Sequence, residues 1–436
     1  MWLLVGLVLN PWTIAGLASP DGEINSPLTF GAIATFDVVL IALGLRILLR
    51  PRPINRRKLG FTAAMIVFSV LFAEGLLRVV DLFVPPGHAD TPRYLRAAYR
   101  DKSWSKELFA ELDDLAFDSR AFAYSPFIGW ETTEFHREYV NVGSDGTRAC
   151  WNPDFAPGAE PLSIDVFGGS TIWGMGVRDN FTIPSQLSRL LDSRGHPFEV
   201  HNYGDLAYTF TQELFNLILL LKDGHRPDYV IFYDGVNDVY AGYQYGTTGH
   251  VIDCFKLPEK FERRDNAASY LARGLGKLVE EHSRIYQYVL RASRPKSDGA
   301  AFPEKGAHFD DAALRRLGTD IADFYASSQR MLEPLSREYG FEYVCLWQPV
   351  SLLEDHLLPG EREDIRITDT KLGKLHRYVI DELRDRDLPN FIDLTDVLAD
   401  RDAPYYFDYC HLTKDGNHVV AERICNIVEQ RFTTAR

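Results

Sequence analysis

The amino-acid sequence predicts an α/β domain in which helices cover both faces of a parallel sheet, preceded by membrane-spanning helices. Two observations lead to this fold class. From residue 161 onward, five short β-type runs alternate with longer segments of helical period, and this alternation is typical of a parallel sheet. Before residue 85, three apolar runs each approach the ~20 residues that a helix needs to cross a bilayer.

The three apolar runs cover residues 1–18, 27–49 and 59–84. The first resembles a signal peptide at "GLAS", but it lacks the positively charged start of one, which favours a retained span. The loop "RILLRPRPINRRK", between the second and third runs, carries six bases and no acid. We therefore expect this loop to be cytoplasmic, which puts everything after residue 84 in the periplasm or at the cell surface.

Three charged residues interrupt the third run: Glu74, Arg78 and Asp81. Glu74 and Arg78 are four residues apart on one helix face and can pair. These charges either contact a membrane-protein partner or a lipid headgroup, or they mark an interfacial helix end that reaches water. The second interpretation is favoured because all three lie in the outer half. The lipid bilayer is an expected partner, and a membrane-protein partner is left open.

Composition places the rest of the chain among ordinary globular proteins. The 436 residues are 46% hydrophobic and 25% charged, and the length allows more than one domain. The net charge of −14 lies mostly beyond residue 90, where no basic stripe with interleaved aromatics occurs. We therefore expect no nucleic-acid partner. The sequence also lacks a phosphate-binding glycine motif and clustered metal-ligand spacing, so we expect no cofactor and no metal.

The parallel sheet is predicted from five β-type runs with helical segments between them. In chain order the runs are "SIDVFGG", "FEVHNYG", "YVIFYDG", "YVCLWQP" and "NFIDLT". The helical segments are "IPSQLSRLLDSRG", "TQELFNLILLLKDG", "LGTDIADFYASSQRMLEPLSREYG", "LGKLHRYVIDELRDRD" and "HVVAERICNIVEQRF". In the first of these, Pro184 stands near the helix start and Gly195 just past its end, as expected for helix boundaries.

Two regions depart from the alternation and set the domain organisation. Residues 1–84 form the predicted membrane anchor, residues 85–160 a connecting segment, and residues 161–436 the α/β domain with an insertion at about 240–310. The connecting segment contains "GWETTEFHREYVNVGSDGTRACW", which we expect to add strands or a loop layer beside the site. The insertion follows the third strand and is either a lid or a structural pair of helices.

Polar residues follow the strands at the edge where parallel sheets bind ligands. Ser170 follows the first strand, Gly204 the second, and Asn237 the third, in "GVND". Near the end of the chain, "FDYCHLTKDGNH" places Asp408 and His411 three residues apart. This spacing lets a carboxylate reach Nδ1 of the imidazole while Nε2 faces a serine.

Each of these residues also has a simpler interpretation. A serine after two glycines is most often a helix cap, Gly204 can be only a turn, and Asn237 can stabilise a loop. A lone His411 would be a surface or core histidine. Their joint occurrence in one order, three of them at successive strand ends, favours an acyl-transfer site with a nucleophile, a base, an orienting acid and oxyanion donors.

"GGST", the glycine of "NYGD", "GVND" and "DYCH" resemble the four blocks of the SGNH (GDSL-like) hydrolase family, over roughly residues 160–436. Together with the apolar N-terminus, "GW" at 129–130 and "GMGVRDNFTIPSQL" resemble membrane-anchored bacterial members of that family. The resemblance implies a flavodoxin-like three-layer fold with a five-stranded parallel sheet. It also implies Ser170 as nucleophile, His411 as base, and Asp408 as the residue that orients the base. The implied oxyanion donors are the N–H groups of Ser170 and Gly204 with the Asn237 amide.

One position departs from the family pattern. Gly169 stands where the family's first block usually has an aspartate before the serine. A hydrogen bond that would hold the serine loop is therefore expected to be missing, which makes the loop geometry and the substrate preference near Ser170 less predictable.

The five cysteines form no C-x-x-C pair, which disfavours a zinc ribbon or a thioredoxin-type motif. Cys345 and Cys425 lie in apolar segments and are predicted to be buried thiols. Cys150, Cys254 and Cys410 lie in loop-like segments, and outside the cytoplasm two of them could pair. Cys410 is either a thiol packed under the histidine loop or half of a disulfide with Cys150 or Cys254.

The predicted function is a serine-dependent ester hydrolase that acts outside the cytoplasm on an acylated carbohydrate or lipid. An acylated small molecule or glycan is the expected substrate. One alternative is an O-acyltransferase that modifies an envelope polysaccharide with the same Ser-His-Asp site. Another is a non-catalytic scaffold that binds glycans or partner proteins.

Overall fold

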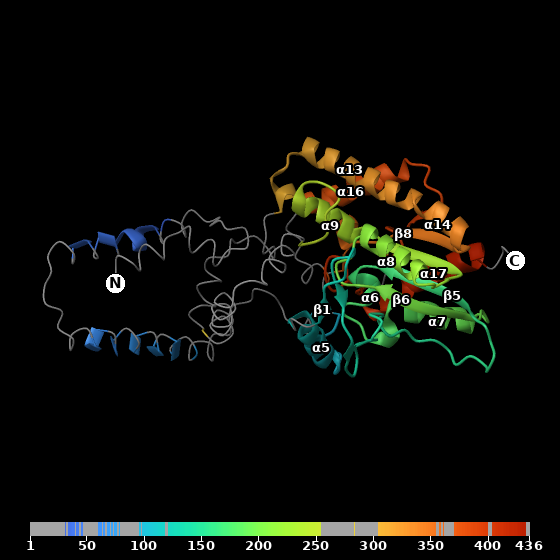
Figure 1. Cartoon of the computed structure of the whole chain (residues 1–436), viewed down its shortest axis with the longest axis horizontal. Coiled ribbons are helices and arrows are strands. Elements are labelled where there is room, and N and C mark those ends of the chain that lie inside the picture. The colour runs from blue at the N-terminus through green and yellow to red at the C-terminus, as the bar shows by residue number, and fades with distance from the viewer. Residues whose placement is uncertain are drawn as a thin grey trace. The chain divides into compact units, whose positions relative to one another are not determined.

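The computed structural model describes residues 98–117, 121–253, 304–354, 370–399 and 403–432, with scattered positions between 31 and 96 and at 283, 357, 358 and 361 (Figure 1). The chain divides into two units. One comprises Met1–Ala89 with Phe255–Ala301, and the other Asp90–Cys254 with Phe302–Arg436. The segment predicted to connect the anchor to the α/β domain thus belongs, from Asp90 onward, to the same unit as that domain.

In the first unit, the described residues between 31 and 46 and between 60 and 78 are helical. Arg78 Nη2 lies 3.2 Å from Glu74 Oε1, which confirms the predicted i,i+4 pair. The first predicted span and most of the basic loop lie outside the described residues. Among the residues that are described, no helix combines the length and hydropathy needed to cross a membrane, so the predicted transmembrane helices find no support there.

The second unit is built on the predicted parallel sheet. Its strands are β5 (Leu162–Gly168), β6 (Phe198–Gly204), β7 (Tyr229–Asp234), β8 (Glu342–Trp347) and β9 (Phe391–Asp393). They pair in the order β6-β5-β7-β8-β9, all parallel. Counted within this sheet the order is 2-1-3-4-5, which is the flavodoxin-like arrangement. The predicted fold class of this domain is therefore confirmed.

Helices cover both faces of the sheet (Figure 1). One face packs against α7 (Ile183–Ser193) and α17 (Lys414–Phe432), and the short α6 (Ser170–Trp173) joins the same core cluster through Ile172. The other face packs against α8 (Phe210–Lys222), α9 (Val236–Tyr245), α13 (Asp311–Arg330), α14 (Leu332–Tyr339) and α16 (Thr370–Arg384). The central strand β7 is buried on both sides, and its six residues are all buried, as expected for a parallel strand between two helical layers.

Local sequence signals explain where the helices next to the site begin. α7 begins after Thr182, whose side chain accepts a hydrogen bond from the Ser185 N–H, and Pro184 lies in its first turn. α8 begins with a capping box between Thr209 and Gln212. Both devices satisfy N–H groups that a helix start leaves without partners.

The connecting segment forms a layer of helix and short strands. It contains α5 (Ser105–Phe117) and two antiparallel pairs, β1 (Phe122–Ala123) with β2 (Glu131–Thr132) and β3 (Phe135–His136) with β4 (Asn141–Val142). Short 3₁₀ turns occur at Asp179–Phe181, Lys305–His308 and Ser351–Leu353. An isolated bridge joins Arg148 to Asn202 of β6. Of the two expected alternatives, strands or a loop layer, the segment forms short strands.

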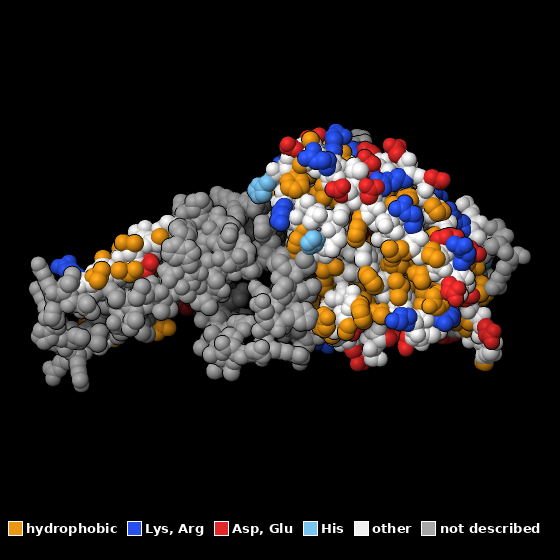
Figure 2. Space-filling view, turned by 45° about the horizontal axis from the view of Figure 1, so that its top comes forward, with side chains coloured by type: hydrophobic (Ala, Val, Ile, Leu, Met, Phe, Trp, Pro, Cys, Tyr) orange, Lys and Arg blue, Asp and Glu red, His pale blue; other side chains and the backbone are white. Residues whose placement is uncertain are grey.

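One face of the α/β body carries side chains of both charge signs (Figure 2). On the face in Figure 2, acidic and basic side chains are interspersed over the described part of the chain. Hydrophobic side chains also lie on this face, in several patches between the charged ones.

Candidate active site

Ser170 is the first residue of α6, and Gly169 alone separates it from Gly168, the last residue of β5. Its Oγ is 2.7 Å from Nε2 of His411. A Cβ at Gly168 would lie only 2.4 Å from Ile172 Cγ1, so the turn can pack this closely against α6 only with glycine there. The turn thus brings a serine and a histidine that are 241 residues apart into hydrogen-bond contact.

Asp408 orients the histidine from the other side. Its Oδ2 lies 2.7 Å from His411 Nδ1, and its Oδ1 accepts the N–H groups of Cys410 and His411 at 3.0 and 2.8 Å. Burial by itself raises the pKa of Asp408, but the charge of His411 and these hydrogen bonds outweigh burial and hold that pKa at about 2. Asp408 is therefore ionised at neutral pH and can stabilise a protonated imidazole.

The imidazole is also held by a ring beneath it. Phe407 stacks on His411 with ring centroids 5.6 Å apart and an interplanar angle of 20°. Gly176 makes room for this ring, because a Cβ at that position would lie 2.2 Å from Phe407 Cε1. Phe407 in turn packs with Tyr99, Phe109 and other core residues of the connecting segment. The connecting segment therefore supports the histidine loop through Phe407.

Cys410 is a buried free thiol. It packs with Val236 and Val350, and its Sγ lies 3.6 Å from His411 Nδ1. Burial, followed by the charge of Asp408, raises the pKa of the thiol well above its usual range. Cys150 is also free, so the alternative of a disulfide between these two is wrong, and Cys410 is the thiol under the histidine loop. Cys254 lies outside the described residues.

Asp408, Cys410 and His411 place ligand-type atoms within 4.8 Å of one another. Two of these groups already have hydrogen-bond partners. The Asp408 carboxylate bonds to His411 Nδ1 and also accepts the N–H groups of Cys410 and His411. The thiol is held in its protonated form, which is a poor metal ligand. The Asp408, Cys410 and His411 atoms are therefore better explained by hydrogen bonds that hold the histidine than by binding of a metal ion.

Asn237 reaches the site from the start of α9, one residue after the helix begins at Val236. Gly235 before it has φ +122°, a backbone conformation that favours glycine. The Asn237 Nδ2 donates to the Tyr208 carbonyl at 2.7 Å. Within the described part of the chain, the Tyr208 carbonyl is the acceptor found for this amide nitrogen.

Gly169 and Asn237 fit against each other. A Cβ at position 169 would lie 2.2 Å from Asn237 Nδ2 and 3.3 Å from the Tyr208 carbonyl oxygen. In place of the acidic side chain expected in the family pattern, the serine turn has a bare backbone that the Asn237 amide approaches closely. The missing side chain is therefore matched by the position of Asn237.

Gly204 does not have the predicted geometry of an oxyanion donor. Its N–H donates to Asn202 Oδ1 at 3.0 Å and is buried at the end of β6. A Cβ here would lie 2.4 Å from the Trp173 nitrogen, so glycine is needed for close packing of β6 against α6. The sequence prediction for Gly204 is corrected: this residue positions the serine helix.

Ala207 is the residue that sequence reasoning missed. It has φ +63°, a left-handed conformation that alanine seldom adopts, and it immediately precedes Tyr208, whose carbonyl accepts the Asn237 amide. Among the described residues, no acceptor is found for the N–H groups of Ala207 and Ser170. Nothing in "DLAYTF" signals this, because alanine has no preference for a left-handed turn.

The connecting segment holds the loop that carries Ala207. Thr132 donates through its N–H to Asp205 Oδ2 at 2.9 Å and through its hydroxyl to Asp205 Oδ1 at 2.5 Å. Trp130 donates its indole N–H to the Leu206 carbonyl at 3.0 Å, and the Tyr208 hydroxyl donates to the Trp130 carbonyl. Burial raises the pKa of Asp205 to about 6, although the hydrogen bonds from Thr132 and Leu206 lower it. The "GW" motif is thus a structural support of the candidate site.

Known proteins resemble this chain in solved structures. No protein-family model matches the chain, and no curated protein matches it. Solved structures similar to it include the acetyl xylan esterase AlAXEase, at 16% identity over 61% of this chain and 100% of that chain, with a TM-score of 0.33. A carbohydrate acetylesterase family member from Sinorhizobium meliloti has 16% identity over 62% and 98%, with a TM-score of 0.29. The lipase/acylhydrolase from Enterococcus faecalis has 14% identity over 62% and 96%, with a TM-score of 0.32. The α/β architecture is established by the sheet order of this chain itself.

Proposed function

We propose that the protein is a serine-dependent ester hydrolase of the SGNH type. The observation that carries the proposal is the continuous chain of two 2.7 Å contacts, from Ser170 Oγ to His411 Nε2 and from His411 Nδ1 to Asp408 Oδ2. A nucleophile, a base and an orienting carboxylate in this geometry are the requirements of nucleophilic acyl transfer. A scaffold protein has no need for this arrangement.

In the proposed mechanism, Ser170 Oγ attacks the ester carbonyl carbon while His411 Nε2 takes the hydroxyl proton. The C–O bond to the alcohol then breaks, and His411 returns the proton to the leaving alkoxide. Water then attacks the acyl carbon of the acyl-serine while His411 Nε2 accepts its proton. The bond from this carbon to Ser170 Oγ breaks, His411 returns the proton to Oγ, and the acid leaves. The Asp408 carboxylate stabilises the imidazolium that forms in both steps.

The developing oxyanion needs donors placed before the reaction begins. We assign this role to the N–H groups of Ser170 and Ala207 and to the second amide hydrogen of Asn237. The first two have no acceptor among the described residues, and Asn237 is fixed by its bond to Tyr208. The backbone strain at Ala207 fits a functional loop, where such strain is often found.

Three measurements test this proposal. A fluorophosphonate probe should label Ser170 in folded protein, and Ser170→Ala should abolish labelling and lower kcat on para-nitrophenyl acetate by at least about 10³-fold. Acid released in water without any acceptor supports hydrolysis. Product formed only when a sugar hydroxyl is supplied would replace this assignment by an O-acyltransferase, and full turnover by Ser170→Ala would refute the site.

The location outside the cytoplasm is a further part of the proposal. Its support is the charge difference between the basic stretch at residues 46–58 and the acidic loop that carries Asp21 and Glu23. Reporter fusions after residue 90 test it: activity of an alkaline phosphatase reporter, which requires export, is the expected result. Activity only of a cytoplasmic reporter would contradict it.

A further inference from the structure

The residues that follow β8 contact all three turns that carry the candidate site. This segment is "QPVS", residues 348–351, and it begins directly after β8 ends at Trp347. The Gln348 N–H donates to the carbonyl of Asp234, the last residue of β7, at 2.9 Å. The QPVS segment therefore starts at the carboxyl edge of the sheet, where the candidate site lies.

Gln348 holds the serine turn through the residue next to the nucleophile. The Thr171 hydroxyl donates to Gln348 Oε1 at 2.8 Å, and both side chains are buried. Gly169 brings no side chain to the turn, and α6 has no side-chain hydrogen bond at its N-terminal cap. The Thr171–Gln348 bond therefore ties a helix of only four residues to the end of β8.

The same segment is fixed to the histidine loop. The N–H and the hydroxyl of Ser351 both donate to the Tyr409 carbonyl, at 3.0 and 2.9 Å. Tyr409 follows Asp408, in the loop that presents His411. Ser351 is itself buried. Two hydrogen bonds from one buried residue to one carbonyl thus fix the histidine loop relative to Gln348, which stands only three positions earlier.

Val350 joins the segment to the turn of Asn237. It is buried and packs with Val236, which precedes Asn237, and with Cys410, which precedes His411. The QPVS segment therefore contacts a direct neighbour in the chain of every residue of the candidate site described above except Gly204.

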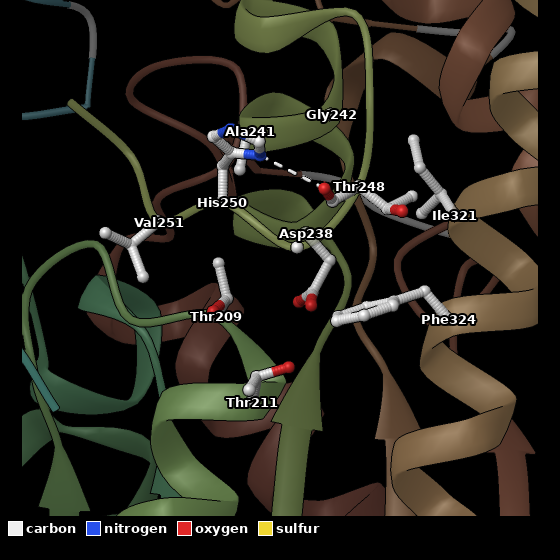
Figure 3. A pocket seen from close by; sticks show the side chains of 11 residues that line it. Thr209, Thr211, Asp238, Ala241, Gly242, Thr248, His250, Val251, Ile321 and Phe324 are labelled. Carbon is white, nitrogen blue, oxygen red and sulfur yellow. Dashed lines mark hydrogen bonds between the residues drawn. The ribbon is translucent and has the colours of Figure 1, made fainter. Parts of the chain in front are cut away.

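The start of α9 has a packed side and an open side. Asp238 is directed into a hollow of about 450 Å³, partly open to solvent, which residues of α8, α9, α13 and the turn after α9 line (Figure 3). Val236, two residues earlier, points to a different side of the helix and is buried against Val350. The QPVS segment therefore supports α9 on its packed side.

Proton transfer between Ser170 and His411 depends on the distance between Oγ and Nε2. The two ends of this 2.7 Å contact belong to elements 241 residues apart, so the fold has to fix both at once. A displacement of about 1 Å can cost about 10²-fold in rate. Gln348 is placed to prevent it, because it bonds to the neighbour of the serine while Ser351 bonds to the histidine loop.

We propose that Gln348 is a positioning residue of the candidate site, which holds Ser170 Oγ in reach of His411 by acting through Thr171. The inference rests on the proposed ester hydrolysis and adds a residue that sets the geometry of its nucleophile. The simpler alternative is that Thr171 and Gln348 only satisfy each other as buried polar groups, with no effect on the chemistry beyond stability.

Paired substitutions separate these two roles. Gln348→Met and Thr171→Val each leave a buried partner unpaired, so each should lower the urea midpoint. Each should also lower kcat on para-nitrophenyl acetate about 10- to 100-fold with KM within about twofold of wild type. The double variant removes both polar partners, so it should recover most of the stability but keep the low kcat of the single variants. Thr171→Ser, which keeps the hydroxyl, should recover most of the kcat lost in Thr171→Val.

Ser188→Ala is the matched control. Ser188 is buried in α7, and its hydroxyl donates to Asn152 Oδ1 at the same 2.8 Å. Its loss should lower the urea midpoint while kcat stays within about twofold of wild type. If kcat fell as far in Ser188→Ala as in Gln348→Met, or returned with stability in the double variant, the positioning role would be wrong.

Nitrogen NMR of the His411 ring gives a readout that needs no turnover. The Nε2 resonance, assigned by its loss in His411→Gln, reports the contact with Ser170 Oγ. It should shift in Gln348→Met and in the double variant and stay in place in Ser188→Ala. Wild-type protein without esterase activity would refute the proposed function, and this shift would still support the positioning role. An unchanged resonance in Gln348→Met would refute the positioning role alone.

Discussion

At the scale of single residues, the candidate site depends on the close approach of the Asn237 amide, a proposed oxyanion donor, to the serine turn at Gly169. Gly169→Ala would place a Cβ 2.2 Å from Asn237 Nδ2, and Asn237 cannot retreat without losing its bond to Tyr208. We predict that kcat falls about 10- to 100-fold, below the full cost of losing one oxyanion donor. Steady-state kinetics on para-nitrophenyl acetate measures this.

A matched glycine provides the control for that substitution. A Cβ at Gly373, in α16, would meet only ordinary contacts of 3.6 Å and beyond, so Gly373→Ala should keep activity and gain helix stability. If Gly169→Ala were as active as Gly373→Ala, the Asn237 amide would not be needed where it lies.

A second residue-scale prediction concerns Asp408, whose carboxylate lies 2.7 Å from His411 Nδ1. Asp408→Asn keeps an oxygen that can accept the N–H groups of Cys410 and His411, but it removes the charge next to Nδ1. We predict a loss of kcat of about 10²- to 10⁴-fold with little change in KM. Circular dichroism should be unchanged.

Asp408→Ala is the informative comparison, because it also removes the two loop hydrogen bonds. It should lower the unfolding midpoint as well as kcat, whereas Asp408→Asn should lower kcat alone. Wild-type kcat in Asp408→Asn would remove Asp408 from the proposed mechanism.

At the scale of elements, one arginine fastens the connecting segment to the serine helix. Arg148 is fully buried; its Nε donates to Asp179 Oδ1 at 2.6 Å, and its other nitrogens donate to the carbonyls of Trp173 and Val177. The guanidinium carbon also lies 4.2 Å from the centre of the Trp173 ring. We predict that Arg148→Met lowers the free energy of unfolding by about 3 kcal/mol or more.

Urea unfolding measures this difference. The control is Arg337→Met in the exposed i,i+4 pair with Glu333, which should change the same quantity by about 0.5 kcal/mol or less. Equal effects of the two substitutions would mean that Arg148 does not fasten the layer to α6.

The elements themselves were largely predictable from local pattern. All five strands follow from β-type runs, and α7 and α8 start at signals visible in the sequence, Thr182 with Pro184 and Thr209 with Gln212. The Ser170, Asn237 and His411 positions follow from strand ends and one short motif. These features depend on residues near one another in the chain.

What the sequence could not predict depends on tertiary contacts. The Gly204 N–H donates to Asn202 at the end of β6, where the strand packs closely against α6. Ala207 keeps its left-handed conformation in a loop that is held by distant residues. Trp130 and Thr132, more than seventy residues earlier in the chain, donate hydrogen bonds to Leu206 and Asp205 of this loop. No period or propensity encodes these contacts.

At the scale of the whole molecule, buried acids govern the pH dependence of stability. Burial, followed by the charge of Asp234, raises the pKa of Glu213 well above 4.5, and burial raises that of Asp234 well above 3.8. The two buried carboxyls therefore retain a proton between them. Burial also raises the pKa of Asp238 and of Asp205 to about 6.

The sign of the effect follows from linkage. A carboxyl group with a raised folded pKa contributes stability that is present below its unfolded pKa and is lost as pH rises through the folded value. His225 acts in the same direction, because its hydrogen bond to Asp165 raises its pKa. Asp408, with a pKa of about 2 in place of 3.8, loses its contribution only at lower pH. Stability should therefore be greatest in mildly acidic solution.

We predict that the free energy of unfolding decreases as pH rises from about 4 through 6 and beyond, and that Glu213→Gln makes the decrease shallower. The amide introduced by this substitution would donate to Asp234 without needing a proton, so the pair would no longer share one. Urea unfolding of both proteins at several pH values measures the two slopes. Glu333→Gln, on an exposed pair with Arg337, should keep the wild-type slope, because that carboxyl is solvated. Identical slopes for Glu213→Gln and wild type would show that the buried pair holds no shared proton.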